Sequence, residues 1–135
     1  MGYYSLLLQF CDITDNPTEK VTFEAVSKAG YMIEYVKNPT YELKLIAVRN
    51  DPESIKYIKE PNEEIQLLAV KNTLMHTVKY IEKHTAKVQA YIIKKDSYYT
   101  QYIKYPTNST KEYVLANAKP SKIEEIKAFW AKYEK

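Results

Sequence analysis

Glycine and cysteine are almost absent from this 135-residue chain, and each shortage argues against a class of function. The two glycines, Gly2 and Gly30, provide no glycine-rich loop of the kind that cradles phosphate groups. A single cysteine, Cys11, excludes a disulfide within the chain and is typical of a reducing compartment. We interpret Cys11, which stands next to Asp12, as a small buried hydrophobic residue rather than a nucleophile.

Long apolar runs and arginine are scarce as well. Runs such as Leu6-Leu7-Leu8 are far shorter than the roughly 20 residues that a membrane span needs. No basic and then apolar leader opens the sequence, so we expect a cytoplasmic protein without a membrane partner. Arg49 is the only arginine, and the net charge of +3 is a weaker bias than dedicated nucleic-acid-binding domains usually carry.

Histidine is limited to His76 and His84. Neither has a cysteine, aspartate or glutamate at the spacing of a known helical metal motif, so we interpret both as near-surface residues. Ser97 and Thr100 have no base positioned near them in the sequence. We therefore expect no enzymatic activity: no catalytic residue, no metal site and no cofactor.

What the sequence does contain is a pattern that repeats about every 22 residues. Pro17, Pro39 and Pro61 are 22 residues apart, and Pro106 follows after two further periods and one inserted residue. Two other columns keep the same period, namely the pairs Ala25-Val26, Ala47-Val48 and Ala69-Val70, and the tyrosines Tyr35, Tyr57, Tyr80 and Tyr102. Several columns with one period predict a repeating supersecondary unit.

Each repeat is predicted to contain two short helices. The proline is followed by a residue whose side-chain oxygen can cap the next helix, at Thr18, Thr40, Asn62 and Thr107. Asparagine at the end of the first helix predicts a left-handed C-terminal cap, at Asn50, Asn72 and Asn117. Apolar residues surround the first helix almost completely, so neighbouring repeats must cover it on several sides.

These patterns predict an all-α fold, a small right-handed α-solenoid of tandem two-helix repeats in one domain of residues 1–135. Residues 1–16 would form an N-terminal cap, residues 17–118 the tandem repeats, and residues 119–135 an amphipathic capping helix at the C-terminus. Residues 3–10 are predicted as part of a truncated first repeat, with a strand as the alternative.

The repeat is irregular in one place. Proline is missing at Lys83-His84, and the extra residue of the period falls between Thr73 and Lys79. We expect the stack to bend or unwind locally there.

The segment VRNDPESIKYIKEPNEEIQLLAVKN resembles the short α-helical repeats of the variant leucine-rich and HEAT-like kind. It is even more similar to the Pro-Asn/Thr-x-x-Ile/Val-Gln-x-x-Ala-Val-Lys repeats of proteins from phages, prophages and large DNA viruses. The resemblance covers residues 13–118 and implies an α-solenoid without implying a reaction. By analogy it implies a phage- or prophage-encoded factor that binds and inhibits a host protein in the host cytoplasm, for example an anti-CRISPR protein.

The tyrosine column carries the main functional prediction. Stacked repeats would present Tyr35, Tyr57, Tyr80 and Tyr102 as a ladder along one face, with Lys37, Lys59 and Lys104 two residues further along the chain. The rings could pack between neighbouring second helices, or contact another protein, since tyrosine is enriched at interfaces. With the lysines they could instead stack on single-stranded nucleic acid and neutralise it.

Trp130 is the second candidate. Trp130 and the adjacent Phe129 can both face the core only if the apolar stripe of the C-terminal helix is wide, so one of the two rings could be exposed to a partner. Core packing is the favoured interpretation, and contact with a partner or a dimer mate is the alternative. We therefore predict a non-catalytic protein-interaction module that uses the four tyrosines, the three lysines and Trp130. A nucleic-acid or nucleoprotein partner is the alternative, and the sequence leaves a homodimer open.

Overall fold

The computed structural model describes residues 19–134, and every regular element in that range is a helix. The α-helices are α2 (Glu19–Lys28), α3 (Tyr41–Asn50), α4 (Glu63–Thr77), α5 (Ala86–Lys95), α6 (Asn108–Asn117) and α7 (Ile123–Ala131). Short 3₁₀ helices alternate with them: η1 (Gly30–Tyr35), η2 (Pro52–Tyr57), η3 (Val78–Tyr80), η4 (Ser97–Tyr102) and η5 (Pro120–Lys122). The predicted all-α class is confirmed for this range, whereas the predicted N-terminal cap, residues 1–16, lies outside it.

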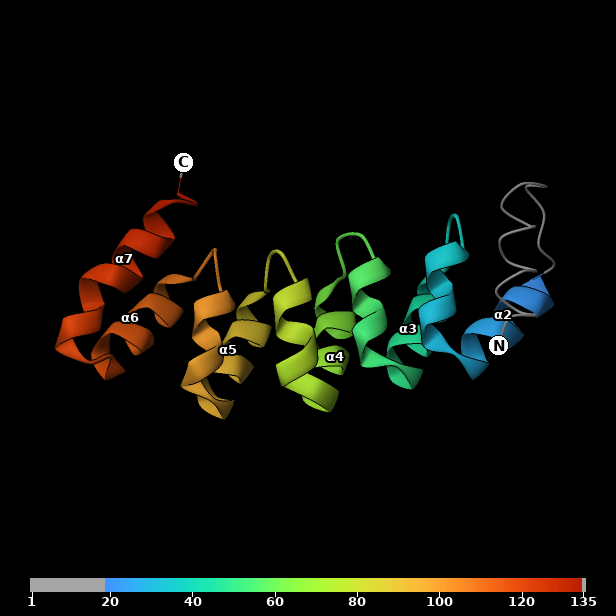
Figure 1. Cartoon of the computed structure of the whole chain (residues 1–135), viewed down its shortest axis with the longest axis horizontal. Helices are drawn as coiled ribbons and strands as arrows, with labels where there is room; N and C mark the ends of the chain where they lie inside the picture. Colours follow the sequence, from blue (N-terminus) through green and yellow to red (C-terminus); the bar gives the residue numbers. More distant parts are fainter. Residues whose placement is uncertain (1–18, 135) are drawn as a thin grey trace.

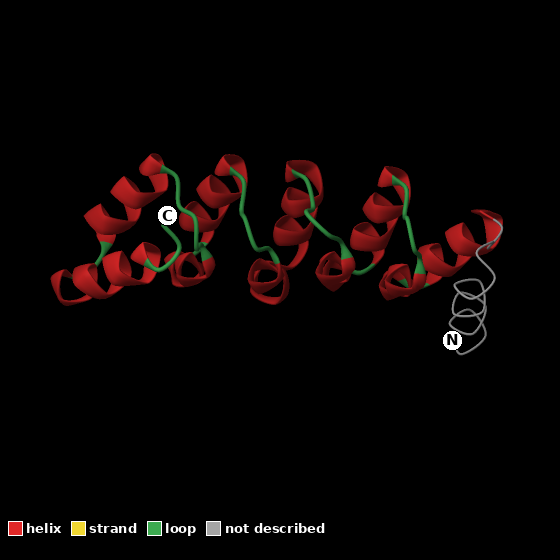
Figure 2. Cartoon of the chain, turned by 90° about the horizontal axis from the view of Figure 1, so that it is seen from above, coloured by secondary structure: helices red, strands yellow, loops and turns green. Residues whose placement is uncertain are grey.

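The helices form two layers. We call an α-helix together with the 3₁₀ helix that follows it a helix pair, and these pairs lie side by side along the long axis of the molecule (Figure 1). Consecutive α-helices from α2 to α6 contact one another, and so do consecutive 3₁₀ helices from η1 to η4. Seen from above, the helices form two rows (Figure 2). The 3₁₀ layer is the face toward the viewer in Figure 1.

One extended residue joins the two helices in each of the four pairs from α2–η1 to α5–η4. Ala29, Asp51, Thr73 and Asp96 occupy this joint, with φ between −163° and −142°. Thr73 interrupts α4 with non-helical torsion angles, so the inserted residue makes the second helix of this pair, residues 74–80, one residue longer than its equivalents. The irregularity predicted between Thr73 and Lys79 is therefore one extra residue, which lengthens the helix of residues 74–80.

Three of the predicted N-terminal caps are confirmed. The side chains of Thr40, Asn62 and Thr107 accept hydrogen bonds from the backbone amides of Leu43, Ile65 and Thr110, at 3.2, 3.0 and 3.2 Å. Each cap satisfies an amide that the first turn of a helix otherwise leaves without a partner. The fourth predicted cap, Thr18, lies outside the described residues.

The predicted left-handed caps at the asparagines are wrong. Among the described residues only Glu60 combines a side chain with a positive φ. The chain leaves each first helix through the extended joint residue instead, so no left-handed residue is needed. The asparagine side chains are used differently: Asn50 donates to the carbonyls of Val26 and Ser27, at 3.2 and 2.7 Å, and so ties α3 to the end of α2.

The alanine and valine columns form the core. Ala25, Ala47 and Ala69 are completely buried, and the valines that follow them are buried beside them. Small side chains at this position let neighbouring α-helices approach closely. Gly30 serves the same purpose at the start of η1, because a Cβ there would overlap the carbonyl oxygen of Ala47. Each fully buried valine or isoleucine stabilises the fold by about 1.5–3 kcal/mol.

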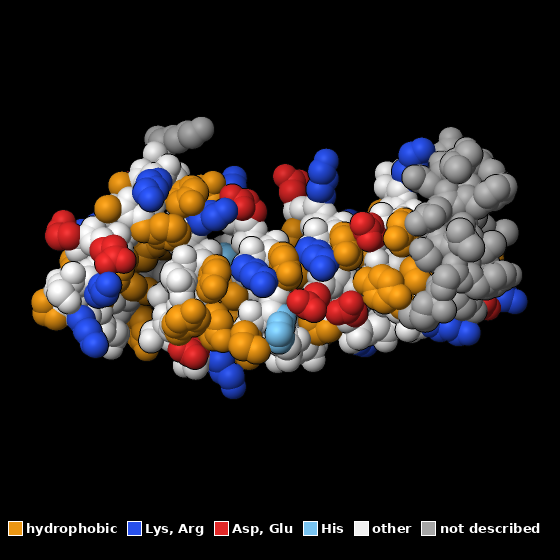
Figure 3. Space-filling view, viewed as in Figure 1, with side chains coloured by type: hydrophobic (Ala, Val, Ile, Leu, Met, Phe, Trp, Pro, Cys, Tyr) orange, Lys and Arg blue, Asp and Glu red, His pale blue; other side chains and the backbone are white. Residues whose placement is uncertain are grey.

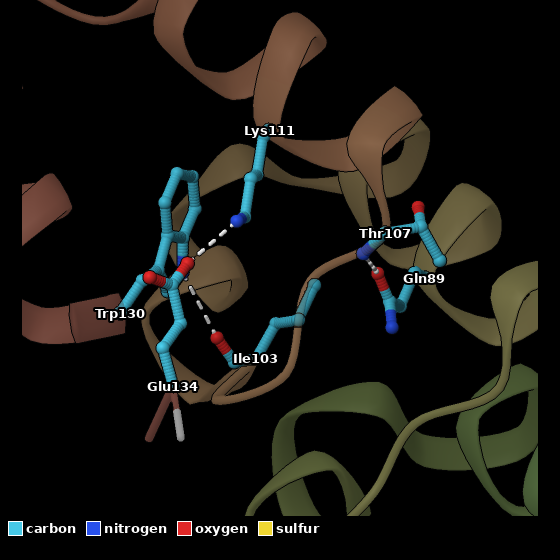
Figure 4. A network of polar contacts seen from close by, with 6 residues as sticks. All are labelled: Gln89, Ile103, Thr107, Lys111, Trp130 and Glu134. Atoms are coloured by element: carbon cyan, nitrogen blue, oxygen red, sulfur yellow. Dashed lines mark hydrogen bonds and ion pairs between the residues drawn. The ribbon is translucent and has the colours of Figure 1, made fainter. Parts of the chain in front are cut away.

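Two buried glutamines bridge consecutive helix pairs. The Gln66 amide donates to the carbonyls of Pro61 and Lys83, and its oxygen accepts from the backbone amide of Thr85. Gln89, one repeat later, donates to the carbonyls of His84 and Tyr105 and accepts from the amide of Thr107 (Figure 4). Each side chain therefore makes three hydrogen bonds and joins its own helix to the loop that starts the next one.

Candidate functional site

The four predicted tyrosines occupy one structural position. Tyr35, Tyr57, Tyr80 and Tyr102 are the last residues of η1, η2, η3 and η4, so each of the four helix pairs from α2–η1 to α5–η4 contributes one ring to the 3₁₀ layer. Tyr57 is 36% exposed, and the other three are half-buried against the core. We call these four residues the tyrosine row. Each ring uses part of its surface for packing and leaves part accessible.

The three predicted lysines differ in their surroundings. Lys37 and Lys59 are exposed, whereas the ammonium group of Lys104 pairs with the carboxylate of Glu82 at 2.8 Å. This hydrogen bond to Glu82 raises the pKa of Lys104. Glu82 occupies the equivalent position two residues after Tyr80, so the third helix pair contributes an acidic residue there, and this residue neutralises Lys104.

Two other lysines lie directly against the tyrosine row. The Lys56 ammonium is 5.2 Å from the centre of the Tyr57 ring and 5.6 Å from that of Tyr80. The Lys79 ammonium is 5.2 Å from the centre of the same Tyr80 ring. We call Lys56 and Lys79 the lysine pair; these separations are those of cation–π contacts. The nearby tyrosines, chiefly Tyr57, raise the pKa of Lys56.

The sequence carried a signal for the lysine pair that the prediction missed. Both lysines immediately precede a tyrosine of the row, whereas the predicted lysines follow it by two residues. Lys56 also reaches the ring of Tyr80 in the next helix pair, and that neighbour is known only once the pairs are placed side by side.

Further apolar side chains are exposed on the 3₁₀ layer. Tyr98 is 63% exposed and Met75 60%, and Tyr31 is also exposed. The rings of Tyr98 and Tyr99 meet edge to face, with centroids 5.1 Å apart, and Tyr99 stacks on Tyr102. The space-filling view of this face shows apolar side chains alternating with lysines across its middle (Figure 3). Large apolar side chains gathered in this way are typical of interaction surfaces.

Trp130 does not belong to this surface. Its side chain is only 4% exposed, and its indole N–H donates to the carbonyl of Ile103 at 3.1 Å (Figure 4). The assignment of Trp130 to the partner-binding residues is therefore corrected in favour of core packing. The neighbouring ion pair between Lys111 and Glu134, 2.7 Å long, also holds the C-terminal residues to α6.

The two histidines differ as well. His76 is exposed, with Nδ1 3.9 Å from a carboxylate oxygen of Glu53. His84 was also predicted near the surface, but it is 6% exposed, and its Nε2 donates to the carbonyl of Val78 at 3.0 Å. The loop that holds His84 is covered because Gln66 and Gln89 bind it from both sides. In the described range, 19–134, no three potential metal-ligating side chains converge.

We expect the stability of the protein to fall as the pH drops below about 6.5, the ordinary pKa of histidine. Burial lowers the pKa of His84, with smaller opposing contributions from its bond to Val78 and from Glu82. Below this pH the imidazole of His84 is protonated in the unfolded chain but stays neutral in the folded chain. The free energy of unfolding therefore decreases by at most about 1.4 kcal/mol for each unit by which the pH falls. Urea unfolding at pH 7.5 and pH 5.5 measures the decrease.

The His84→Gln variant should lose most of this pH dependence, whatever its stability at neutral pH. An equal decrease in wild type and His84→Gln would contradict the role of His84.

None of the helices that the structure describes combines the length and the apolar character required to cross a membrane. No protein-family model matches the chain, and neither a curated protein nor a solved structure matches it. The function must therefore be inferred from the chain's own residues and their geometry.

Proposed function

We propose that this chain is a non-catalytic protein-interaction module and that it binds its partner through the 3₁₀ layer. The observation that carries the proposal is the tyrosine row, in which each pair from α2–η1 to α5–η4 places one partly accessible ring at the same position. Tyrosine offers rigid contact area and a hydroxyl group, and it is over-represented among the residues that dominate binding energy. Tyr98 and Met75 extend the apolar area of the same layer.

The finer architecture is part of the proposal. We propose that the helix pairs are the repeats of a right-handed α-solenoid that α7 closes. Support comes from the 22-residue period, from the extended joint residue that recurs in each pair, and from contacts between consecutive pairs. A stack of this kind presents an extended surface to a partner without requiring a cleft.

A protein partner is better supported than nucleic acid. A nucleic-acid surface needs several unopposed lysines or arginines along the phosphate backbone. Here acidic residues interrupt the cations of the 3₁₀ layer: Glu34 takes the position equivalent to Lys56, and Glu82 pairs with Lys104. The viral origin and the inhibitory role that the resemblance implies stay predictions.

The double variant Tyr57→Ala/Tyr80→Ala tests the proposal. We expect it to lose capture of the wild-type protein's partner from lysate, because each truncated interface tyrosine of this kind costs about 2 kcal/mol or more, roughly 30-fold in affinity. Circular dichroism should show that helicity is kept. The matched control is Tyr41→Ala/Tyr113→Ala, which removes two exposed rings from the α-helical layer. Unchanged capture by the first variant would refute this use of the tyrosine row.

A further inference from the structure

Neither member of the lysine pair forms an ion pair within the described part of the chain, and the carboxylate of Glu53 adds only the last of several contributions that raise the pKa of Lys56. The ion pairs found there involve His76, Lys87, Lys104, Lys111, Lys122 and Lys127. Lys56 and Lys79 are exposed, and their ammonium groups lie over tyrosine rings only, both of them within 5.6 Å of the centre of the Tyr80 ring. Two positive charges therefore share the middle of the tyrosine row.

This arrangement restricts what can bind there. A protein that covers Tyr57 and Tyr80 also covers the lysine pair, because the ammonium groups lie against those rings. Removing a charged group from water without pairing it costs several kcal/mol, more than a cation–π contact returns. Favourable binding therefore requires the partner to bring negative charge to this point.

We infer that the partner is a protein segment with acidic side chains, which places aspartate or glutamate carboxylates against Lys56 and Lys79 and apolar groups on the adjacent rings. The inference rests on the proposed function and adds the chemistry of the partner. Carboxylates complement the ammonium groups, and the exposed parts of Tyr57, Tyr98 and Met75 provide the apolar contact. The charge pairing also selects against basic and neutral segments.

Selection from a library of short random peptides tests the inference. The immobilised wild-type protein should enrich peptides that contain aspartate or glutamate together with aromatic or aliphatic residues. The same selection on Lys56→Gln/Lys79→Gln should show no acidic enrichment. The matched control, Lys94→Gln/Lys95→Gln, removes two exposed lysines at the end of α5 and should select like the wild type.

Synthetic versions of the enriched peptides make the test quantitative. Replacing their acidic residues by the corresponding amides should weaken binding by about tenfold or more, and raising the ionic strength should weaken the acidic version selectively. Enrichment without acidic residues, enrichment that survives Lys56→Gln/Lys79→Gln, or no enriched peptide at all would overturn the inference. Binding of random-sequence single-stranded oligonucleotides in place of peptides would overturn it in favour of nucleic acid.

The two proposals fail in different ways. If partner capture is lost in Tyr57→Ala/Tyr80→Ala but kept in Lys56→Gln/Lys79→Gln, the tyrosine row binds a protein and the acidic partner is wrong. If both variants keep capture, the proposed function itself is wrong.

Discussion

Alanine at Gln66 and Gln89 is expected to lower the free energy of unfolding by about 2–3 kcal/mol for each replacement. Each glutamine makes three hydrogen bonds to backbone groups of two consecutive helix pairs. A single hydrogen bond contributes about 1 kcal/mol net, and a buried group left without its partner costs about 1–3 kcal/mol. Urea unfolding followed by circular dichroism measures the change.

The loss should also appear as reduced cooperativity. Each glutamine connects one helix pair to the next, so the double variant should unfold over a broader range of urea concentration, with a lower m-value. Gln101→Ala is the matched control, because Gln101 is exposed and donates only to the nearby Tyr98 carbonyl. It should change the stability by less than about 0.5 kcal/mol. An equal effect of Gln101→Ala and Gln89→Ala would show that the bridges are unimportant.

Truncation of Trp130 to alanine is expected to have the largest single effect, about 3–5 kcal/mol. The ring is buried at the C-terminal end of the molecule, where it lines a pocket together with residues of η4 and α6 and donates to Ile103. Its removal leaves a cavity and a carbonyl without a donor. Thermal unfolding followed by circular dichroism is the appropriate measurement, since Trp130 is the only tryptophan and the variant has no tryptophan fluorescence.

Two further variants separate the contributions of Trp130. Trp130→Phe keeps most of the apolar volume but loses the indole N–H, so it should cost less than Trp130→Ala. Tyr98→Ala, which removes an exposed ring of the 3₁₀ layer, should have little effect on stability. If Trp130→Ala unfolded at the same temperature as the wild type, the packing of α7 would contribute nothing to the fold.

The sequence predicted the helices well because their signals are local. A capping side chain such as that of Thr40 or Asn62 acts on an amide three residues away, so its effect can be inferred without a tertiary structure. The alanine and valine columns were equally informative, since every repeat needs small or branched side chains at the same buried position. The tyrosine row follows from the same period.

Apart from the left-handed asparagine caps, the errors concern contacts between different helices and loops. Trp130 meets Ile103, 27 positions away, and its burial depends on where α7 packs. His84 is buried because Gln66 and Gln89, from two different helices, hold its loop. The lysine pair was missed because Lys56 meets Tyr80 of the next helix pair as well as its own neighbour Tyr57.

The sequence by itself determined the period, the helical class and the position of one tyrosine in each of the four helix pairs from α2–η1 to α5–η4, because these depend on side chains that act within a few residues. Only the tertiary structure decided which cations lie on the rings, which side chains bridge the pairs, and which aromatic residue is buried. Those properties depend on the side-by-side placement of helices. This placement sets the distances between atoms about 22 residues apart in the chain, and no local sequence pattern specifies these distances.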